Sequence, residues 1–136
     1  MAQVAPINKE FLFDGSIIIS QTDLKGIIVY ANRKFCEVSG YNKDELVGQP
    51  HNIIRHPGMP RDAFQKMWNT ISSGHVWNGL VKNMRKDGLY YWVDTEILPI
   101  EDENKEITGY IASRKSASRK DVDEAEAVYG KMYEEQ

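Results

Sequence analysis

The sequence predicts an α+β fold, in which a five-stranded antiparallel sheet carries short helices on one face and a further helix follows at the C-terminus. The main observation is the order of segments: two strand-like segments, several short helical segments, and then three longer strands in a meander. The second observation is composition. With 136 residues, 41% of them apolar, the chain suits a single domain with one hydrophobic core.

Two β-branched segments predict the first hairpin. Residues 16–20 (SIIIS) and 27–31 (IIVYA) favour strands, and residues 22–26 between them favour a turn. Ahead of the hairpin, residues 9–13 are compatible with a short turn of helix. The hairpin supplies the first two strands of the expected sheet.

Three helices are expected after this hairpin. Asn32 is a favourable N-cap for the first, and Gly40 is a natural stop. Asn42 and Glu45 have the spacing of a capping box, which predicts a short second helix. A longer helix is expected over residues 60–73, with a proline in its first turn. Its apolar residues recur at the spacing of one buried stripe: Ala63, Phe64, Met67, Trp68 and Ile71.

The next part of the chain changes to strand-like patterns. Residues 75–86 and 89–100 flank the dipeptide Asp87-Gly88, a strong signal for a hairpin turn. A charged turn then leads to a third long strand at 107–116. These three strands complete the predicted sheet of five.

The C-terminal segment has helical features. Ser118 is a suitable N-cap, and acidic residues follow in the first turn. Its apolar residues share one stripe: Val122, Ala125, Tyr129 and Met132. This stripe needs a partner, which the sheet, a second copy of the chain or a following domain would provide.

Charge and composition restrict the function classes. A net charge of −3 and a pI of about 5.6 argue against nucleic acid as the main partner. No apolar run approaches the roughly 20 residues that span a bilayer, so we expect no direct membrane insertion. Cys36 is the single cysteine, which excludes an internal disulfide and favours a cytoplasmic location. No catalytic motif stands out, so we expect no enzyme.

Four stretches resemble a known family. "NRKFCEVSGYNKDELVG" (32–48) and "KDGLYYWV" (86–93) resemble the signature and the central hairpin of sensory PAS domains. "GQPHNIIRHPGMPRDAFQKMW" (48–68) and "WNGLVKNMRKDG" (77–88) are similar to the FAD-binding PAS domains of bacterial aerotaxis receptors. One position differs, because that group usually has an aspartate where this chain has Gly58.

The resemblance implies a PAS fold, a domain organisation and a function. It implies an N-terminal cap segment at 1–13, a PAS domain at 14–116 and a connector or signalling helix at 117–136. It also implies a redox or oxygen sensor that binds FAD. Such a module relays the oxidation state of its flavin to a signal-transduction output, here chemotaxis or aerotaxis through a downstream chemoreceptor domain.

The candidate site residues begin with Arg55 and His56. FAD carries a diphosphate, and the forked donors of an arginine suit it. The alternative for this pair is a surface loop with solvated cations. His51 and Arg61 are further candidates nearby.

Aromatic and amide residues supply the next candidates. Trp68 and Trp77 suit the wall of a flavin or adenine site, although aromatic side chains also fill cores. Asn83 lies on the same predicted strand face as Trp77 and offers both a donor and an acceptor to the flavin's pyrimidine edge.

Two polar residues complete the set. Asn32 is most simply a helix cap, and the resemblance also places it at the rim of the cofactor site. Arg114 lies where related light-sensing PAS domains have a flavin-contacting glutamine. A fixed cation there would stabilise a negatively charged reduced flavin, whereas the alternative is a partly exposed charge on a strand.

The sequence also bears on other classes of module. A metal site is not expected, because His51 and His56 have no cysteine or third ligand nearby. Photochemistry through a cysteine adduct is not expected either, since Ile53 occupies the position of the required cysteine. The two alternatives to a flavin sensor are a haem-binding gas sensor, with one of these histidines as axial ligand, and a cofactor-free module that forms a homodimer.

Overall fold

A computed structural model describes residues 4–135 of the chain and confirms the α+β prediction. The elements follow in the expected order, with one additional 3-10 helix, η1. Their bounds are β1 Ile18–Asp23, β2 Ile28–Ala31, α1 Arg33–Ser39, α2 Lys43–Leu46, η1 His51–Ile54, α3 Arg61–Ser72, β3 Trp77–Met84, β4 Tyr90–Glu101, β5 Ile107–Ser116 and α4 Arg119–Glu135.

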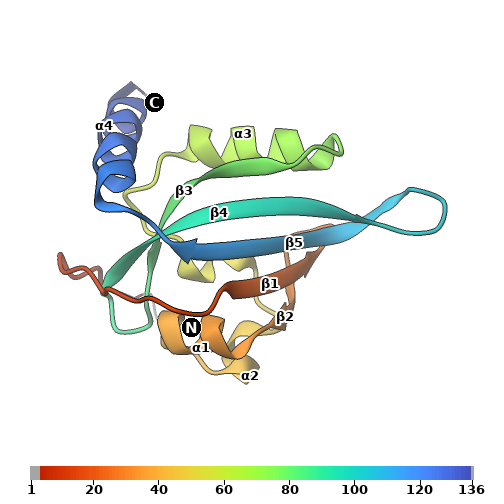
Figure 1. The fold of residues 1–136 in the computed structure, drawn as a ribbon, viewed down its shortest axis with the longest axis horizontal. Coiled ribbons are helices and arrows are strands. Elements are labelled where there is room, and N and C mark those ends of the chain that lie inside the picture. Colours follow the sequence, from red (N-terminus) through yellow and green to blue (C-terminus); the bar gives the residue numbers. More distant parts are fainter. Residues whose placement is uncertain (1–3, 136) are drawn as a thin grey trace.

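The five strands form one antiparallel sheet in the order β2-β1-β5-β4-β3. Figure 1 shows α1 and α2 beside the β1–β2 edge, α3 beside β3, and the β4–β5 turn projecting beyond the rest of the sheet. Over residues 4–135, the structure contains no helix with both the length and the apolar character needed to cross a membrane.

Helices α1, α2 and α3, together with η1, cover one face of the sheet, here called the inner face. Its buried apolar residues include Ile18, Val81, Val93 and Ala112, which pack with residues of α1 and α3. Four polar residues are also buried at inward strand positions: Ser20, Asn83, Thr95 and Arg114. Burying a polar side chain costs free energy unless the side chain has hydrogen-bond partners. These four residues therefore indicate the part of the inner face where a binding site is expected.

Asn32 joins α1 to the sheet. Its Oδ1 accepts hydrogen bonds from the backbone N–H of Phe35 and of Ile19, each at 3.0 Å. Its Nδ2 donates to the carbonyl oxygen of Ile17 at 2.9 Å. The predicted N-cap is therefore confirmed, and the same side chain also fixes the helix to β1.

The remaining local signals are confirmed with one change. Asn42 and Glu45 form the predicted capping box of α2. The β3–β4 hairpin forms, but its loop is longer than the two residues predicted. The N–H of Arg85 donates to Leu89 O, and among these loop residues only Gly88 has a positive φ (95°). A two-residue type I′ turn requires two such residues, so the loop takes a wider form.

Two predictions near the N-terminus were wrong. Residues 9–13 form no helix. Instead, Phe11 N–H donates to Tyr90 O, and Tyr90 N–H donates to Lys9 O, so this segment extends along the start of β4. The first strand begins two residues later than expected and includes Thr22 and Asp23, because pairing with β5 continues through them.

Helix α4 packs on the sheet. Of the three partners considered for its apolar stripe, the sheet is the one that the structure shows. Val122 is fully buried. The Tyr129 ring stacks on Trp92 of β4 with centroids 6.4 Å apart, and its hydroxyl donates to the carbonyl oxygen of Leu80 at 2.6 Å. Because β3 is an edge strand, this hydrogen bond covers part of an otherwise open edge.

We predict that Asn32→Ala lowers the free energy of unfolding by about 2 to 3 kcal/mol, since it removes a helix cap and two further hydrogen bonds. Asn42→Ala is the matched control, because it removes a cap without a link to the sheet, and should cost about 1 kcal/mol. Urea unfolding of both variants measures the difference. Equal losses would show that the link to β1 contributes nothing.

Candidate functional site

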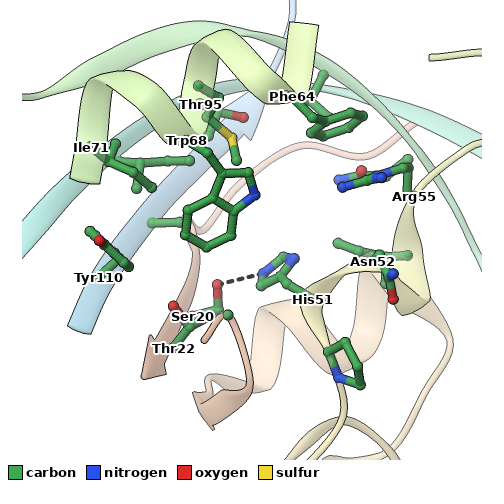
Figure 2. A pocket seen from close by; sticks show the side chains of 18 of the residues that line it. Ser20, Thr22, His51, Asn52, Arg55, Phe64, Trp68, Ile71, Thr95 and Tyr110 are labelled. Atoms are coloured by element: carbon green, nitrogen blue, oxygen red, sulfur yellow. Dashed lines mark hydrogen bonds between the residues drawn. The ribbon is translucent and has the colours of Figure 1, made fainter. Parts of the chain in front are cut away.

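A cavity of about 290 Å³ lies between the inner face of the sheet, η1 and α3. Figure 2 shows its side chains converging from these elements, with Trp68 reaching down from α3 and His51 from η1. Its lining combines apolar walls with separate polar groups and contains no carboxylate. The lining residues are Ser20, Thr22, Lys25, Gly26, Pro50, His51, Asn52, Ile54, Arg55, Phe64, Met67, Trp68, Ile71, Val81, Asn83, Thr95, Ile97, Tyr110, Ala112 and Arg114.

Arg114 is the most buried charge in this lining, with 5% of its surface exposed. Its Nη1 donates to Ser20 Oγ at 3.0 Å, and its Nη2 lies 2.9 Å from His51 Nε2. Across the described residues 4–135, Arg114 forms no ion pair with a carboxylate. Its positive charge is therefore hydrogen-bonded but not neutralised by the protein.

The protonation of His51 follows from these contacts. A guanidinium can only donate, so His51 Nε2 must accept, and the ring proton sits on Nδ1. Ser20 Oγ lies 3.0 Å from the same nitrogen, a contact drawn in Figure 2. Burial, followed by the charge of Arg114, lowers the pKa of His51 to about 3. The ring stacks on Phe35 at 5.7 Å and is neutral at physiological pH.

Arg55 occupies another side of the cavity. Its guanidinium lies over the Phe64 ring, 3.8 Å from the centroid, and burial lowers its pKa. Its Nε is buried and has no hydrogen-bond partner among the described residues. The backbone of Arg55 forms an isolated antiparallel bridge with Asn83, which holds this segment against the open edge of β3.

A third polar group lies on the inner face of the sheet. The hydroxyl of Thr95 is buried and has no partner within residues 4–135. Thr95 pairs across the sheet with Arg114, so the unpartnered hydroxyl and the buried cation lie on neighbouring strands. Buried polar atoms without partners are rare in native proteins and are expected where a ligand or water completes the hydrogen bonding.

Trp68 forms the aromatic wall of the cavity. Its indole meets the Tyr110 ring edge-on, with centroids 5.6 Å apart. It also lies against Gly26, where an added Cβ would be 3.1 Å from the indole. Gly26 has a φ of 83°, so both the turn and this close approach favour glycine. The α3 wall and the β1–β2 turn thus meet beside the cavity.

Four of the seven predicted site residues line this cavity, namely Arg55, Trp68, Asn83 and Arg114, and three lie elsewhere. Asn32 is occupied at the start of α1. Trp77 packs against the buried apolar residues of the core and covers Gly79, where an added Cβ would lie 2.5 Å from the indole. His56 packs edge-on against Tyr90 and accepts a hydrogen bond from Gly58 N–H.

Several lining residues were absent from the predicted set. Thr95 had a usable signal, because it is a polar residue at an inward position of an otherwise apolar strand face. Ser20 gave a weaker signal, because Thr22 on the same face of β1 is polar as well. His51 was considered, but its contact with Arg114 joins residues 63 positions apart. No local pattern reveals such a contact.

Among residues 4–135, no group of three or more histidine, cysteine, aspartate or glutamate side chains is arranged to hold a metal ion. Cys36, the single cysteine, lies on α1 and does not line the cavity. The cavity lining offers two arginines, Lys25, a neutral histidine, amide and hydroxyl groups, and aromatic walls.

Comparison with known proteins supports the predicted fold. A family model described as the PAS fold matches residues 28–114, more than half of the chain. The light-state structure of the blue-light photoreceptor Aureochrome1 LOV superposes with a TM-score of 0.72 at 25% identity, covering 79% of this chain and 90% of that chain. The five-stranded PAS fold is confirmed.

Two curated relatives extend the comparison. The aerotaxis receptor of Escherichia coli is 45% identical over 118 residues, which is 87% of this chain and 23% of the receptor. The nitrogen fixation regulatory protein of Klebsiella oxytoca is 35% identical over 103 residues, covering 76% of this chain and 21% of the regulator. The chain spans less than a quarter of either relative.

We predict that His51 makes the fold sensitive to acid. The unfolded chain takes up a proton at this residue near pH 6.5, whereas the folded chain resists protonation until about pH 3. The free energy of unfolding should therefore fall as the pH drops between these values, by up to about 1.4 kcal/mol per unit. His51→Gln should reduce this slope by about one proton in urea unfolding at several pH values.

His75→Gln provides the matched control, because His75 is an exposed histidine outside the cavity. If His51→Gln and His75→Gln change the pH dependence equally, the buried position of His51 has no special role in acid sensitivity.

Proposed function

The chain belongs to the PAS fold family, and we propose that it is an FAD-binding redox or oxygen sensor that relays the oxidation state of its flavin to a signalling output. The observation that carries this proposal is the cavity with a buried arginine and no carboxylate. The similarity to an aerotaxis receptor supports the same class of function. A sensor needs a bound redox group and two conformations, and it needs no turnover.

The residues of the cavity fit a flavin ring system. A flat, largely apolar ring requires apolar walls, which Phe64, Trp68 and Tyr110 provide. Its polar edge requires donors and acceptors, and Asn83 offers both. A bound flavin supplies reversible electron transfer. The unpartnered Thr95 hydroxyl gives the edge of the ring one more hydrogen-bonding group.

Arg114 gives the site a preference for a negatively charged ligand. A guanidinium with hydrogen bonds only to neutral groups stabilises a ligand that gains negative charge, because the attraction acts in a medium of low dielectric constant. Ser20 and His51 hold the guanidinium in place and need not move when the charge appears. Reduction of the ligand is therefore favoured electrostatically in this cavity.

The cavity is too small to enclose the whole of FAD. A volume of about 290 Å³ is at the lower limit of ligand pockets and suits one ring system rather than a whole dinucleotide. The phosphates and the adenosine of FAD would lie outside it. Arg55, which lines the cavity and has an unpartnered Nε, is a candidate to contact the phosphates of FAD.

A route to the output follows from the edge of β3. The Arg55 segment is bridged to Asn83 at one part of this edge, and Tyr129 of α4 is hydrogen-bonded to Leu80 at another. Both therefore respond to the position of the same strand. We take 117–136 as the signalling connector, 14–116 as the sensory domain and 1–13 as its cap. A chemotaxis output through a downstream chemoreceptor domain, in the cytoplasm, completes the proposal.

Three alternatives are less well supported by the geometry. A haem iron in the cavity would need a free histidine nitrogen there, but His51 Nε2 is engaged by Ser20 and Arg114, and His56 does not line the cavity. A cysteine photoadduct would need a thiol at the cavity, and Cys36 lies on α1 outside it. A cofactor-free dimerisation module would leave the partnerless polar atoms of the cavity unexplained.

The visible spectrum of the purified protein tests the proposal. We expect absorption near 450 nm that dithionite bleaches and air restores, with FAD identified by mass spectrometry of the extracted chromophore. A Soret band would instead establish the haem alternative. A colourless protein that takes up no added FAD, FMN or riboflavin would refute flavin binding altogether.

We also predict that Arg114→Gln lowers the reduction potential of the bound flavin by about 30 to 60 mV, which corresponds to a loss of about 1.4 to 2.8 kcal/mol in a two-electron couple. Lys115→Gln is the matched control, because Lys115 is the next residue of β5 and its side chain is 70% exposed. Spectroelectrochemical titration measures both. Equal shifts of the reduction potential in the two variants would mean that the potential depends only on the overall charge of the protein.

A further inference from the structure

The mouth of the cavity can be located from the exposure of its lining. Most lining residues are buried or half-buried, and the exposed ones are Lys25, Pro50 and Asn52. All three come from two adjoining segments, the β1–β2 turn and the start of η1. The cavity therefore reaches solvent between them, and any part of a ligand too large for the interior must leave past these side chains.

The two segments form one rigid border. His51 N–H donates to Gly26 O at 3.0 Å, and Ile27 forms an isolated antiparallel bridge with Pro50. Asp23 Oδ1 accepts from the backbone N–H of Lys25 and of Ile27, so this carboxylate stabilises the turn. The backbone of Lys25 is therefore fixed beside the mouth, while the residue itself is exposed.

The charges around the cavity have one sign. Lys25, Arg55 and Arg114 line it, and no aspartate or glutamate does. Arg114 is held at depth by Ser20 and His51, and the Arg55 guanidinium is stacked on Phe64. Within residues 4–135, Lys25 forms no ion pair. It is the exposed member of the three cations, and it lies beside the mouth through which a large ligand would extend.

We infer that Lys25 contacts the phosphate of a flavin nucleotide and selects phosphorylated flavins over riboflavin. The inference rests on the proposed flavin binding and adds a residue that contributes to specificity. The ring fills the interior, so the phosphate next to the ribityl chain reaches the mouth. A lysine there, with a flexible stem and a compact charge, adjusts to the phosphates of both FMN and FAD.

Binding of three flavins separates this contact from the rest of the site. Apoprotein is prepared by removing any bound flavin, and the affinities for riboflavin, FMN and FAD are measured by fluorescence quenching for the unchanged chain and for Lys25→Gln. We expect the affinities for FMN and FAD to fall about three- to tenfold and to depend less on salt. The affinity for riboflavin should stay within about twofold, because riboflavin has no phosphate.

Two further variants complete the design. Lys25→Arg keeps the charge and should restore most of the FMN and FAD affinity. Lys66→Gln removes another exposed lysine, on α3, that does not line the cavity, and should leave all three affinities unchanged. If Lys25→Gln weakens all three flavins equally, or none of them, the phosphate contact is refuted while flavin binding stands. If the unchanged chain binds none of the three, the proposed function itself fails.

Discussion

The hydrogen-bonded but uncompensated charge of Arg114 is the interaction on which the site depends. Removing a guanidinium from water costs several kcal/mol unless its donors are satisfied. Here Ser20 and His51 satisfy two of them, and His51 can do so only while it is neutral. A carboxylate in their place would neutralise the charge and remove the electrostatic reason for an anionic ligand to bind. The pairing with neutral partners therefore keeps the cavity positive.

This interaction also joins distant parts of the chain. Arg114 pairs with Ile18 of β1 on one side and with Thr95 of β4 on the other, and His51 brings η1 to the same point. A change of charge in the cavity therefore acts on the central strands and on η1 together. The edge strand β3, which pairs with β4 and contacts both the Arg55 segment and α4, is the nearest element that can pass such a change outward.

The sequence predicted what is encoded locally and missed what is encoded by long-range contacts. Asn32 was recognisable because its cap bond spans three residues, and the strand pattern placed Asn83 on the face of Trp77 and Val81. Arg114 was proposed from the resemblance to related PAS domains, and its burial was not predicted. The N-terminal segment was misassigned because its backbone is engaged by β4, about eighty positions away, and this overrides a weak helical preference. The contact between His51 and Arg114 was hidden for the same reason.

Gly58 bears on why the adjacent residues Arg55 and His56, which were predicted to act together, face different surroundings in the structure. An added Cβ at this position would lie 3.0 Å from His56 Nδ1, the atom that accepts the Gly58 N–H. Glycine thus allows the imidazole to fold back on its own loop and to pack against Tyr90. Of Arg55 and His56, only Arg55 lines the cavity, and the other cations that line it, Lys25 and Arg114, come from the β1–β2 turn and from β5. In a chain with aspartate at position 58, this ring would have to move by a few tenths of an ångström, so glycine favours the close approach of the imidazole to its own loop.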